Sequence, residues 1–206
     1  MRYLSYDLRF EGNIRAMSSS KEGGIVNSKL LSVKLLATDV DGVLTNGAIS
    51  YDETGNETKQ FNVSDGLGIV LLAHAGIPVV WITGRASRSV LRRAEELKVV
   101  ECLTGIRDKG AALHFVCNKL DIDLSNVLYI GDDWNDIPAL RISGMSAAPQ
   151  NAALEVLQIV DWRIEINGGE GVLRAACNAI LDAQGRSAEI MESYLESLKQ
   201  SSSTVH

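Results

Sequence analysis

Short apolar runs alternate with amphipathic stretches along the chain from Leu30 onward. The apolar runs predict strands at Val33–Thr38, Pro78–Thr83, Val99–Leu103, Val127–Ile130 and Asp161–Ile166, with a weaker one at Met145–Ala148. Helical patterns lie between them at Leu67–Ala75, Ser87–Leu97, Gly110–Leu120, Ile137–Ile142, Ala152–Leu157 and Val172–Ala183. Continuous apolar strands separated by helices are typical of a parallel sheet covered on both faces. We therefore expect an α/β fold with a doubly wound parallel sheet.

One stretch departs from this alternation. In AISYDETGNETKQFNV, two polar–apolar runs flank the turn-forming residues Asp52–Asn56, which predicts a β-hairpin inserted between residues 46 and 62. We expect residues 1–29 to form an N-terminal extension that could be poorly ordered, and residues 30–185 to form the one domain. Residues 186–206 are a tail, in which Glu189–Lys199 has a helical pattern with Ile190, Tyr194, Leu195 and Leu198 on one side.

Composition narrows the class of protein. The chain has 206 residues, 46% of them hydrophobic, and a net charge of −6, which suits one sizeable core. No basic run with interleaved aromatics occurs, so we expect no nucleic-acid partner. The N-terminus has no long apolar run, so we expect no signal peptide, no membrane partner and a cytoplasmic location. Three widely spaced cysteines without a CxxC pair indicate buried thiols rather than a disulfide framework.

The strongest chemical signal is the sequence LLATDVDGVLT, which starts at Leu35. A buried strand ends in Asp39 and Asp41, and Gly42 follows at once; ligands bind at this edge of an open parallel sheet. Two close carboxylates repel each other, so either a cation lies between them or one keeps a proton. Both arrangements serve phosphoryl transfer, because a shielded carboxylate can attack phosphorus while a protonated one supplies a proton. An isolated pair would more often be a turn with solvated acids.

Two further signals follow other predicted strands. Thr83, Gly84 and Arg85 come directly after Pro78–Ile82, where a hydroxyl and backbone amides could bind a phosphate oxygen, although Thr-Gly alone commonly starts a loop. Lys109 opens the helix Gly110–Leu120, where its ammonium could neutralise a phosphate and a carboxylate nucleophile. A lone lysine is usually a solvated surface charge, so this signal has weight only together with the others.

The last signal is Gly131-Asp132-Asp133-Trp134-Asn135-Asp136, after the strand Val127–Ile130. Carboxylates crowded at a strand end are costly unless a cation is present, and hard oxygen ligands favour Mg²⁺. Asp133 and Asp136 could also serve as helix caps, so Asp132 is the better candidate ligand.

The order Asp-x-Asp, Thr, Lys, Gly-Asp-Asp resembles the four-motif signature of the haloacid dehalogenase superfamily, over roughly Lys34 to Gly185. The resemblance implies a Rossmann-like core and a Mg²⁺-dependent phosphatase. It implies that Asp39 is the nucleophile and Asp41 the general acid and base. It implies that Thr83, Gly84, Lys109 and Gly42 bind phosphate. It also implies that Asp39, Asp132 and the Asp41 carbonyl bind the metal, supported by Asp133, Asn135 and Asp136.

Many members of this superfamily carry a cap domain, but neither the gap from Asp41 to Thr83 nor the gap from Thr83 to Lys109 has room for one. The segments DVDGVLTNG, KQFNVSDGLGI, ITGR, GDDWND and GGEGVLRAACNAILDAQG resemble the capless 3-deoxy-D-manno-octulosonate 8-phosphate (KDO 8-phosphate) phosphatases. This resemblance implies a homotetramer whose C-terminal tails reach neighbouring active sites. It implies that the sugar is contacted by Asn62, Val63, Ser64, Asp65, Gly66, Arg85 and Arg93.

Some positions depart from that family. Asn46 stands where the family usually has Asp, and Ser64, Val70 and Glu170 stand where octulosonate phosphatases usually have arginine. Losing cationic partners should weaken recognition of a sugar acid. Glu170 resembles phosphatases of nine-carbon ulosonate 9-phosphates such as N-acylneuraminate, whereas Arg85 resembles the octulosonate type. KDO 8-phosphate is the first choice of substrate, and a nine-carbon 9-phosphate is the alternative.

Two other classes of protein remain open. A response-regulator receiver also surrounds an aspartyl-phosphate with acids, Thr and Lys, but it lacks a second acid two residues after the nucleophile. A catalytically inactive phosphatase fold that serves as an oligomerisation module is the non-enzyme alternative. The presence of Asp39, Asp41, Thr83, Lys109 and Asp132 together favours activity. For the accessory residues, Arg93 could pair with Glu95 or Glu96, and Ser64 and Asp65 could cap a helix.

Overall fold

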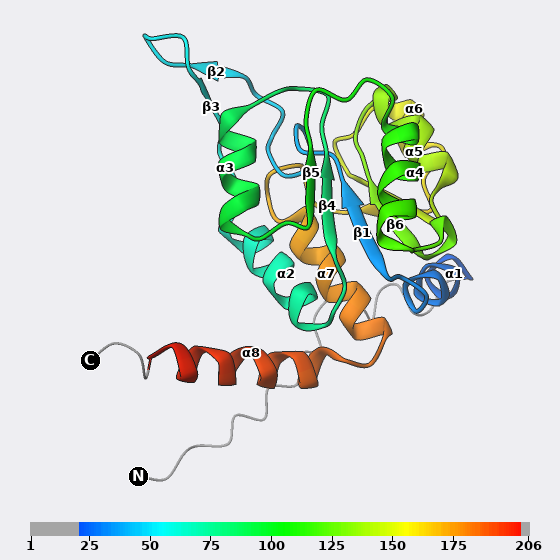
Figure 1. Cartoon of the computed structure of the whole chain (residues 1–206). Helices are drawn as coiled ribbons and strands as arrows, with labels where there is room; N and C mark the ends of the chain where they lie inside the picture. Colours follow the sequence, from blue (N-terminus) through cyan, green and yellow to red (C-terminus); the bar gives the residue numbers. More distant parts are fainter. Residues whose placement is uncertain (1–20, 203–206) are drawn as a thin grey trace.

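The computed structural model describes residues 21–202, and its centre is a six-stranded parallel sheet (Figure 1). The strands are β1 (Leu35–Thr38), β4 (Val79–Ile82), β5 (Glu101–Leu103), β6 (Val127–Ile130), β7 (Met145–Pro149) and β8 (Trp162–Ile164), in the order β5-β4-β1-β6-β7-β8. The chain builds from β1 through β4 to β5, and then returns to place β6 on the other side of β1. This reversal beside β1 is the switch point at which open α/β sheets bind ligands.

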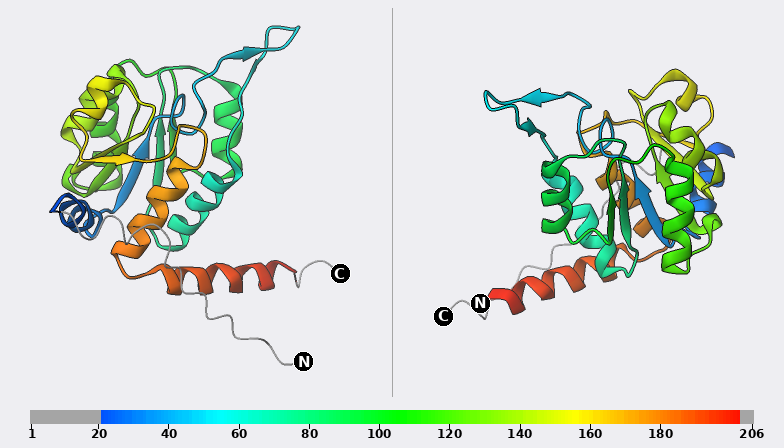
Figure 2. Two further views of the ribbon diagram at one scale, coloured as in Figure 1. Left: turned by 180° about the vertical axis from the view of Figure 1, so that it is seen from behind. Right: turned by 45° about the horizontal axis from the view of Figure 1, so that its top comes forward.

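Helices cover both faces of the sheet (Figure 2). The longer helices are α1 (Lys21–Leu30), α2 (Val63–His74), α3 (Arg88–Glu96), α4 (Lys109–Leu120), α7 (Val172–Ala183) and α8 (Ser187–Ser202). Shorter ones are α5 (Ile137–Ile142), α6 (Leu154–Leu157) and the 3₁₀ turns η1 (Leu124–Asn126) and η2 (Trp134–Asp136). The doubly wound parallel sheet expected from the sequence is confirmed.

Alternate strand residues enter two separate cores. In β1, Leu36 packs in the core that includes α1, α2, α3 and α7, whereas Leu35 and Ala37 pack in the core that includes α4, α5 and α6. All four residues of β1, β4 and β6 are buried. A central parallel strand has no solvent-facing side, which explains why these strands are continuously apolar.

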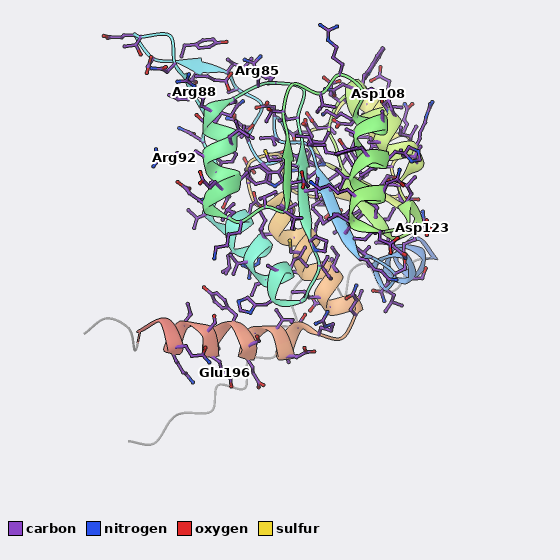
Figure 3. All side chains as sticks on the ribbon, viewed as in Figure 1. Arg85, Arg88, Arg92, Asp108, Asp123 and Glu196 are labelled. Carbon is purple, nitrogen blue, oxygen red and sulfur yellow. The ribbon has the colours of Figure 1, made fainter. Side chains whose placement is uncertain are left out.

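The predicted hairpin is present as β2 (Ser50–Tyr51) and β3 (Glu57–Thr58), paired antiparallel. It extends away from the sheet at the end where the parallel strands finish (Figure 1). Within the described residues, the segments that follow β1 and β4 hold only this hairpin, α2 and α3, so they contain no cap domain. Helix α8 lies at the opposite end of the molecule: Arg85 and Asp108 are labelled at one end, and Glu196 of α8 at the other (Figure 3).

Two helix starts differ from the sequence-based prediction. Helix α2 begins at Val63, with Asn62 as its N-cap, rather than at Leu67, so Ser64 and Asp65 are not its cap. Helix α1 occupies residues 21–30, most of which belong to the N-terminal extension for which the sequence predicts no regular element. Its Val26 and Leu30 are buried in the core, so tertiary packing stabilises a helix whose own pattern is weak. The rest of the predicted extension, residues 1–20, lies outside the described residues.

Among the helices of residues 21–202, none combines the length and apolar character that crossing a bilayer requires.

Candidate active site

The turn after β1 places two carboxylates at the switch point of the sheet. The backbone N–H of Asp39 still bonds to the carbonyl of Ile130 in β6 at 2.9 Å, so Asp39 is held as firmly as a strand residue. Its side chain is almost completely buried, at 5% exposure, and that of Asp41 is 19% exposed. The chain then turns at Gly42, whose φ of +97° is a conformation that other L-residues rarely adopt.

An open cavity of about 180 Å³ lies in front of these carboxylates. It is bordered by residues that follow three neighbouring strands: Asp39 and Asp41 after β1, Thr83, Gly84 and Arg85 after β4, and Asp132, Asp133 and Asn135 after β6. The structure thus brings together side chains from three of the four predicted motifs. Parallel strands make this possible because their carboxyl ends share one edge of the sheet.

The fourth motif contributes Lys109, whose side chain is fully buried at the start of α4. Its ammonium lies 2.9 Å from Oδ1 of Asp39 and 2.7 Å from Oδ1 of Asp136. Burial lowers the pKa of Lys109, but the charges of Asp39 and Asp136 outweigh it, and the net pKa is raised. Lys109 is therefore a permanent cation in contact with the Asp39 carboxylate.

Both carboxylate oxygens of Asp136 accept hydrogen bonds from groups around the site. Its Oδ1 accepts hydrogen bonds from Lys109 and from the Tyr129 hydroxyl at 2.7 Å each. Its Oδ2 accepts from the backbone N–H groups of Asp132 and Asp133, at 3.1 and 3.3 Å. Asp133 caps η2 and forms a capping box with Asp136. Asp136 therefore fixes both Lys109 and the loop that carries Asp132.

The residues present fit a divalent cation. Carboxylate oxygens of Asp39, Asp132 and Asp136 lie within 4.8 Å of one another. Because both oxygens of Asp136 are already engaged, Asp39 and Asp132 are the pair that could bind a metal. Oδ1 of Asp132 and Oδ2 of Asp41 are buried without a hydrogen-bond partner, which is costly unless a ligand is bound there.

The pKa values of Asp39 and Asp132 also favour a cation between these two carboxylates. Burial, followed by repulsion from Asp136, raises the pKa of Asp39 to about 7. Burial, followed by repulsion from Asp39, raises the pKa of Asp132 to about 8. A cation between the two carboxylates would remove this mutual penalty and favour their ionised forms. The oxygen-only donor set is the one that Mg²⁺ prefers.

A glycine-rich loop supports the turn after β1 from behind. The N–H of Gly169 bonds to the carbonyl of Val43 at 2.9 Å, and Asn62 donates to the carbonyl of Gly169 at 3.4 Å. A side chain at Gly168 would lie 1.8 Å from the Gly42 carbonyl, so only glycine fits there. The GGEG segment thus acts on the site through the backbone of the loop that carries Asp41.

Several predicted sugar-binding residues do not border this cavity. Val63 and Ser64 are exposed on the first turn of α2, and Gly66 packs against Arg93. Asp65 is buried, with Oδ1 accepting from the N–H of Arg174 in α7 at 2.8 Å. Arg93 pairs with Glu96 at 3.3 Å. Arg85 is the predicted sugar contact that borders the cavity, so a role for the others in binding stays a prediction.

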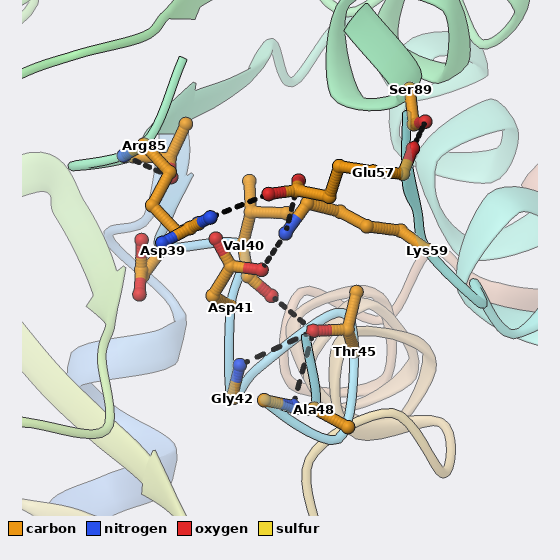
Figure 4. Close-up of polar contacts among 12 residues, drawn as sticks. Asp39, Val40, Asp41, Gly42, Thr45, Ala48, Glu57, Lys59, Arg85 and Ser89 are labelled. Atoms are coloured by element: carbon orange, nitrogen blue, oxygen red, sulfur yellow. Dashed lines mark hydrogen bonds and ion pairs between the residues drawn. The ribbon is translucent and has the colours of Figure 1, made fainter. Parts of the chain in front are cut away.

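The sequence interpretation missed two residues, Glu57 and Lys59. Lys59 forms an ion pair with Asp41 and a second one, at 3.1 Å, with Glu57 (Figure 4). Glu57 also accepts from Arg85 at 2.6 Å. Lys59 stands in the segment KQFNVSDGLGI that carried part of the resemblance, so a signal was present.

A parallel sheet that gathers an Asp-x-Asp turn, a buried lysine and a second acidic loop at one edge is the arrangement of the haloacid dehalogenase-like hydrolases. The family model described as haloacid dehalogenase-like hydrolase matches residues 98–175. The chain belongs to these hydrolases, within the family of the 3-deoxy-D-manno-octulosonate 8-phosphate phosphatases.

Curated relatives carry this family assignment. The phosphatase of that name from Haemophilus influenzae is 36% identical over 84% of this chain and 98% of its own length. The one from Salmonella typhi is 38% identical over 78% of this chain and 86% of its own length.

Solved structures agree. The phosphatase from Moraxella catarrhalis, in complex with magnesium, phosphate and KDO, has a TM-score of 0.80 at 38% identity. That match covers 83% of this chain and 98% of the other. The cobalt-bound Haemophilus influenzae enzyme has a TM-score of 0.75 at 38% identity, over 77% of this chain and 93% of the other.

Proposed function

We propose that this protein is a Mg²⁺-dependent phosphatase that hydrolyses KDO 8-phosphate to KDO and phosphate. The observation that carries the proposal is the placement of buried Asp39 against Lys109, next to Asp41 and Asp132. The relatives' activity and the KDO and magnesium held by the Moraxella catarrhalis structure support it.

The reaction divides between the two carboxylates of the turn. An oxygen of Asp39 attacks phosphorus as the bond to the sugar oxygen breaks, and Asp41 gives its proton to that departing oxygen. The result is an aspartyl-phosphate and free sugar. Asp41, now ionised, takes a proton from water, whose oxygen attacks phosphorus and releases phosphate and the Asp39 carboxylate.

The surrounding groups stabilise charge on the phosphoryl oxygens. Lys109 presents a fixed ammonium, and Thr83 has a hydroxyl hydrogen to donate because its oxygen accepts from the N–H of Arg85 at 3.3 Å. The backbone amide of Gly84 is a further donor, and that of Gly42, which donates to the Thr45 hydroxyl oxygen at 3.4 Å, would exchange this long bond for one to the phosphate. Asp39, Asp132 and the Asp41 carbonyl would hold Mg²⁺, which supplies charge neutralisation between nucleophile and phosphate when bound.

Arg85 is the cation placed to recognise the sugar acid, since it borders the cavity and is anchored by Glu57. The alternative substrate is a nine-carbon ulosonate 9-phosphate, as in sialic acid metabolism. Glu170 favours it: this residue lies in the loop that supports the Asp41 turn, where octulosonate phosphatases usually have arginine. KDO 8-phosphate stays first because of Arg85 and the relatives' activity.

The deciding experiment measures Mg²⁺-dependent phosphate release. We expect the highest kcat/KM for KDO 8-phosphate in a panel with nine-carbon 9-phosphates and hexose phosphates. A higher value for a nine-carbon substrate would select the alternative. Asp39→Asn should abolish turnover while the protein stays folded, and retained turnover would reject the covalent mechanism.

The active unit in this proposal is a cytoplasmic homotetramer. An open cavity without a cap leaves the phosphoryl intermediate exposed to bulk water, so another subunit is needed to cover it. Helix α8 lies at the opposite end of the molecule from Arg85, which borders the cavity, so in this proposal it reaches an active site of another copy (Figure 3). Light scattering tests the tetramer, and removal of the residues after Gly185 should change turnover. A fully active monomer would refute the arrangement, and cell fractionation tests the location.

A further inference from the structure

Lys59 is a buried cation that the reaction described above does not use. It follows β3, and its side chain is only 1% exposed. Burying an ammonium is costly unless an anion compensates it, and here ionised Glu57 does so through Oε1 at 3.1 Å, while Oδ1 of Asp41 also accepts from the ammonium. The chain therefore maintains a buried charge cluster next to its proton-transferring carboxylate.

Glu57, the second partner of Lys59, is held in place by two further hydrogen bonds. Glu57 Oε2 accepts a hydrogen bond from Arg85 at 2.6 Å, and the Glu57 carbonyl accepts from the Ser89 hydroxyl at 3.2 Å (Figure 4). The hydrogen bond from Arg85, with further help from Lys59, lowers the pKa of Glu57 to about 2. Glu57 thus stays ionised and holds the Lys59 ammonium. Glu57 itself is held by Arg85 and by Ser89 of α3.

The contact with Lys59 determines which oxygen of Asp41 is available for proton transfer. One carboxylate oxygen, Oδ1, is occupied by Lys59, while the other, Oδ2, is buried without a hydrogen-bond partner. Figure 4 shows Oδ2 turned away from Lys59, on the side of Asp39. A carboxyl group held through one oxygen has only the other available to exchange a proton with a reacting group.

We propose that Lys59 is the positioning residue of Asp41, with Glu57 as its support. Lys59 holds Oδ1 so that Oδ2 faces the reacting centre, first towards the leaving oxygen and then towards water. The hairpin, which supplies Glu57, thereby becomes part of the proton-transfer apparatus. This inference rests on the proposed phosphatase function and adds the residue that orients the general acid Asp41.

The test compares two phosphate esters that differ in their need for a proton. The phenolate of 4-nitrophenyl phosphate departs unprotonated, whereas the alkoxide of benzyl phosphate must be protonated as it leaves. For Lys59→Met we expect kcat/KM to fall by about 100-fold on benzyl phosphate, the scale of general acid catalysis, and by only a few-fold on 4-nitrophenyl phosphate. Lys59→Arg should recover part of the difference, because a guanidinium can also hold Oδ1.

Several outcomes would overturn the proposal. Equal losses on both esters would mean that Lys59 acts on the phosphate or only on the fold, and no loss would mean that Asp41 needs no support.

Glu57→Gln keeps the buried lysine but weakens the contact that holds it in place. We therefore expect a smaller loss of kcat/KM, again greater for benzyl phosphate, even if Lys59→Met fails to fold. Lys119→Met, which removes a half-exposed lysine paired with Glu101 outside the cavity, should leave both esters unchanged. If the wild-type protein hydrolyses neither these esters nor KDO 8-phosphate, the proposed function fails, whereas equal losses in an active protein reject only the role of Lys59.

Discussion

The α-carbon of Gly42 lies against the carboxylate of Asp132: a methyl group on Gly42 would lie 2.0 Å from Asp132 Oδ2. The turn after β1 and the loop after β6 are thus in direct contact, and this contact determines how far apart Asp39 and Asp132 lie. Position 42 therefore requires glycine for two reasons: a side chain would collide with Asp132, and the φ of +97° is one that other residues rarely adopt.

Gly42→Ala should therefore weaken Mg²⁺ binding by about 10- to 100-fold, the range seen when groups that orient metal ligands are altered. The measurement is the Mg²⁺ dependence of phosphate release, supported by calorimetric titration. Gly55→Ala is the matched control: Gly55 also has a positive φ, +82°, but nothing lies within 4 Å of its side-chain direction. Both variants carry the backbone cost of about 1–2 kcal/mol, and an equal effect on Mg²⁺ affinity would contradict the proposed contact.

Mg²⁺ binding should release protons near neutral pH. The pKa of Asp39 is raised to about 7 and that of Asp132 to about 8, so the metal-free protein retains protons there that the metal must displace. Affinity should rise with pH across this range, by about tenfold per pH unit for each proton released. Calorimetry in two buffers of different ionisation enthalpy measures that release. Asp132→Asn should lower both affinity and proton release, and a pH-independent affinity would show that no proton is displaced.

Most of the catalytic cluster could be predicted because it follows the ends of apolar strands. Asp39 and Thr83 come directly after strands that are buried on both faces, and Asp132 is the second residue after another such strand; parallel strands bring these ends to one edge. The periodicity of the chain was therefore enough to place them near one another. Lys109 was found for the same reason, as the first residue of the helix after β5.

The parts that could not be predicted depend on side-chain direction and on distant contacts. Lys59 and Asp41 meet only because the hairpin turns back over the site, which no local pattern specifies. The phase of α2 also directs one oxygen of Asp65 to the N–H of Arg174 in α7, a contact that the sequence does not indicate. The glycines at positions 66 and 68 hid the start of that helix, because glycine is a weak helix former.

Asp136→Asn should lower the free energy of unfolding by about 3 kcal/mol, because it removes one anion from a buried ion pair with Lys109. The four donors that converge on Asp136 cannot all be satisfied by an amide. Tyr129→Phe removes just one of those bonds and should cost about 1 kcal/mol. Urea unfolding of both variants measures the difference. If Asp136→Asn were no more destabilising than Tyr129→Phe, the charge of Asp136 would not be what holds Lys109.

Asp65 should make the protein less stable as pH rises through weakly acidic values. Burial raises its pKa to about 6 from 3.8, although N–H groups of Arg174 and Leu173 at the start of α7 lower it in part. Between these two values the folded protein holds a proton that the unfolded chain has lost, so the free energy of unfolding falls with rising pH. The penalty is complete above pH 6 and amounts to roughly 2–3 kcal/mol.

Asp65→Asn keeps an oxygen for the N–H of Arg174 and removes the charge. We therefore expect it to stabilise the protein above pH 6, with the gain vanishing towards pH 4. Asp123→Asn provides a control of opposite sign, because hydrogen bonds from Ser125 lower the pKa of that exposed carboxyl. Losing its charge should destabilise the protein at neutral pH and matter less in acid. Urea unfolding of the three proteins across the range measures both trends, and parallel curves for wild type and Asp65→Asn would show that Asp65 carries no buried charge.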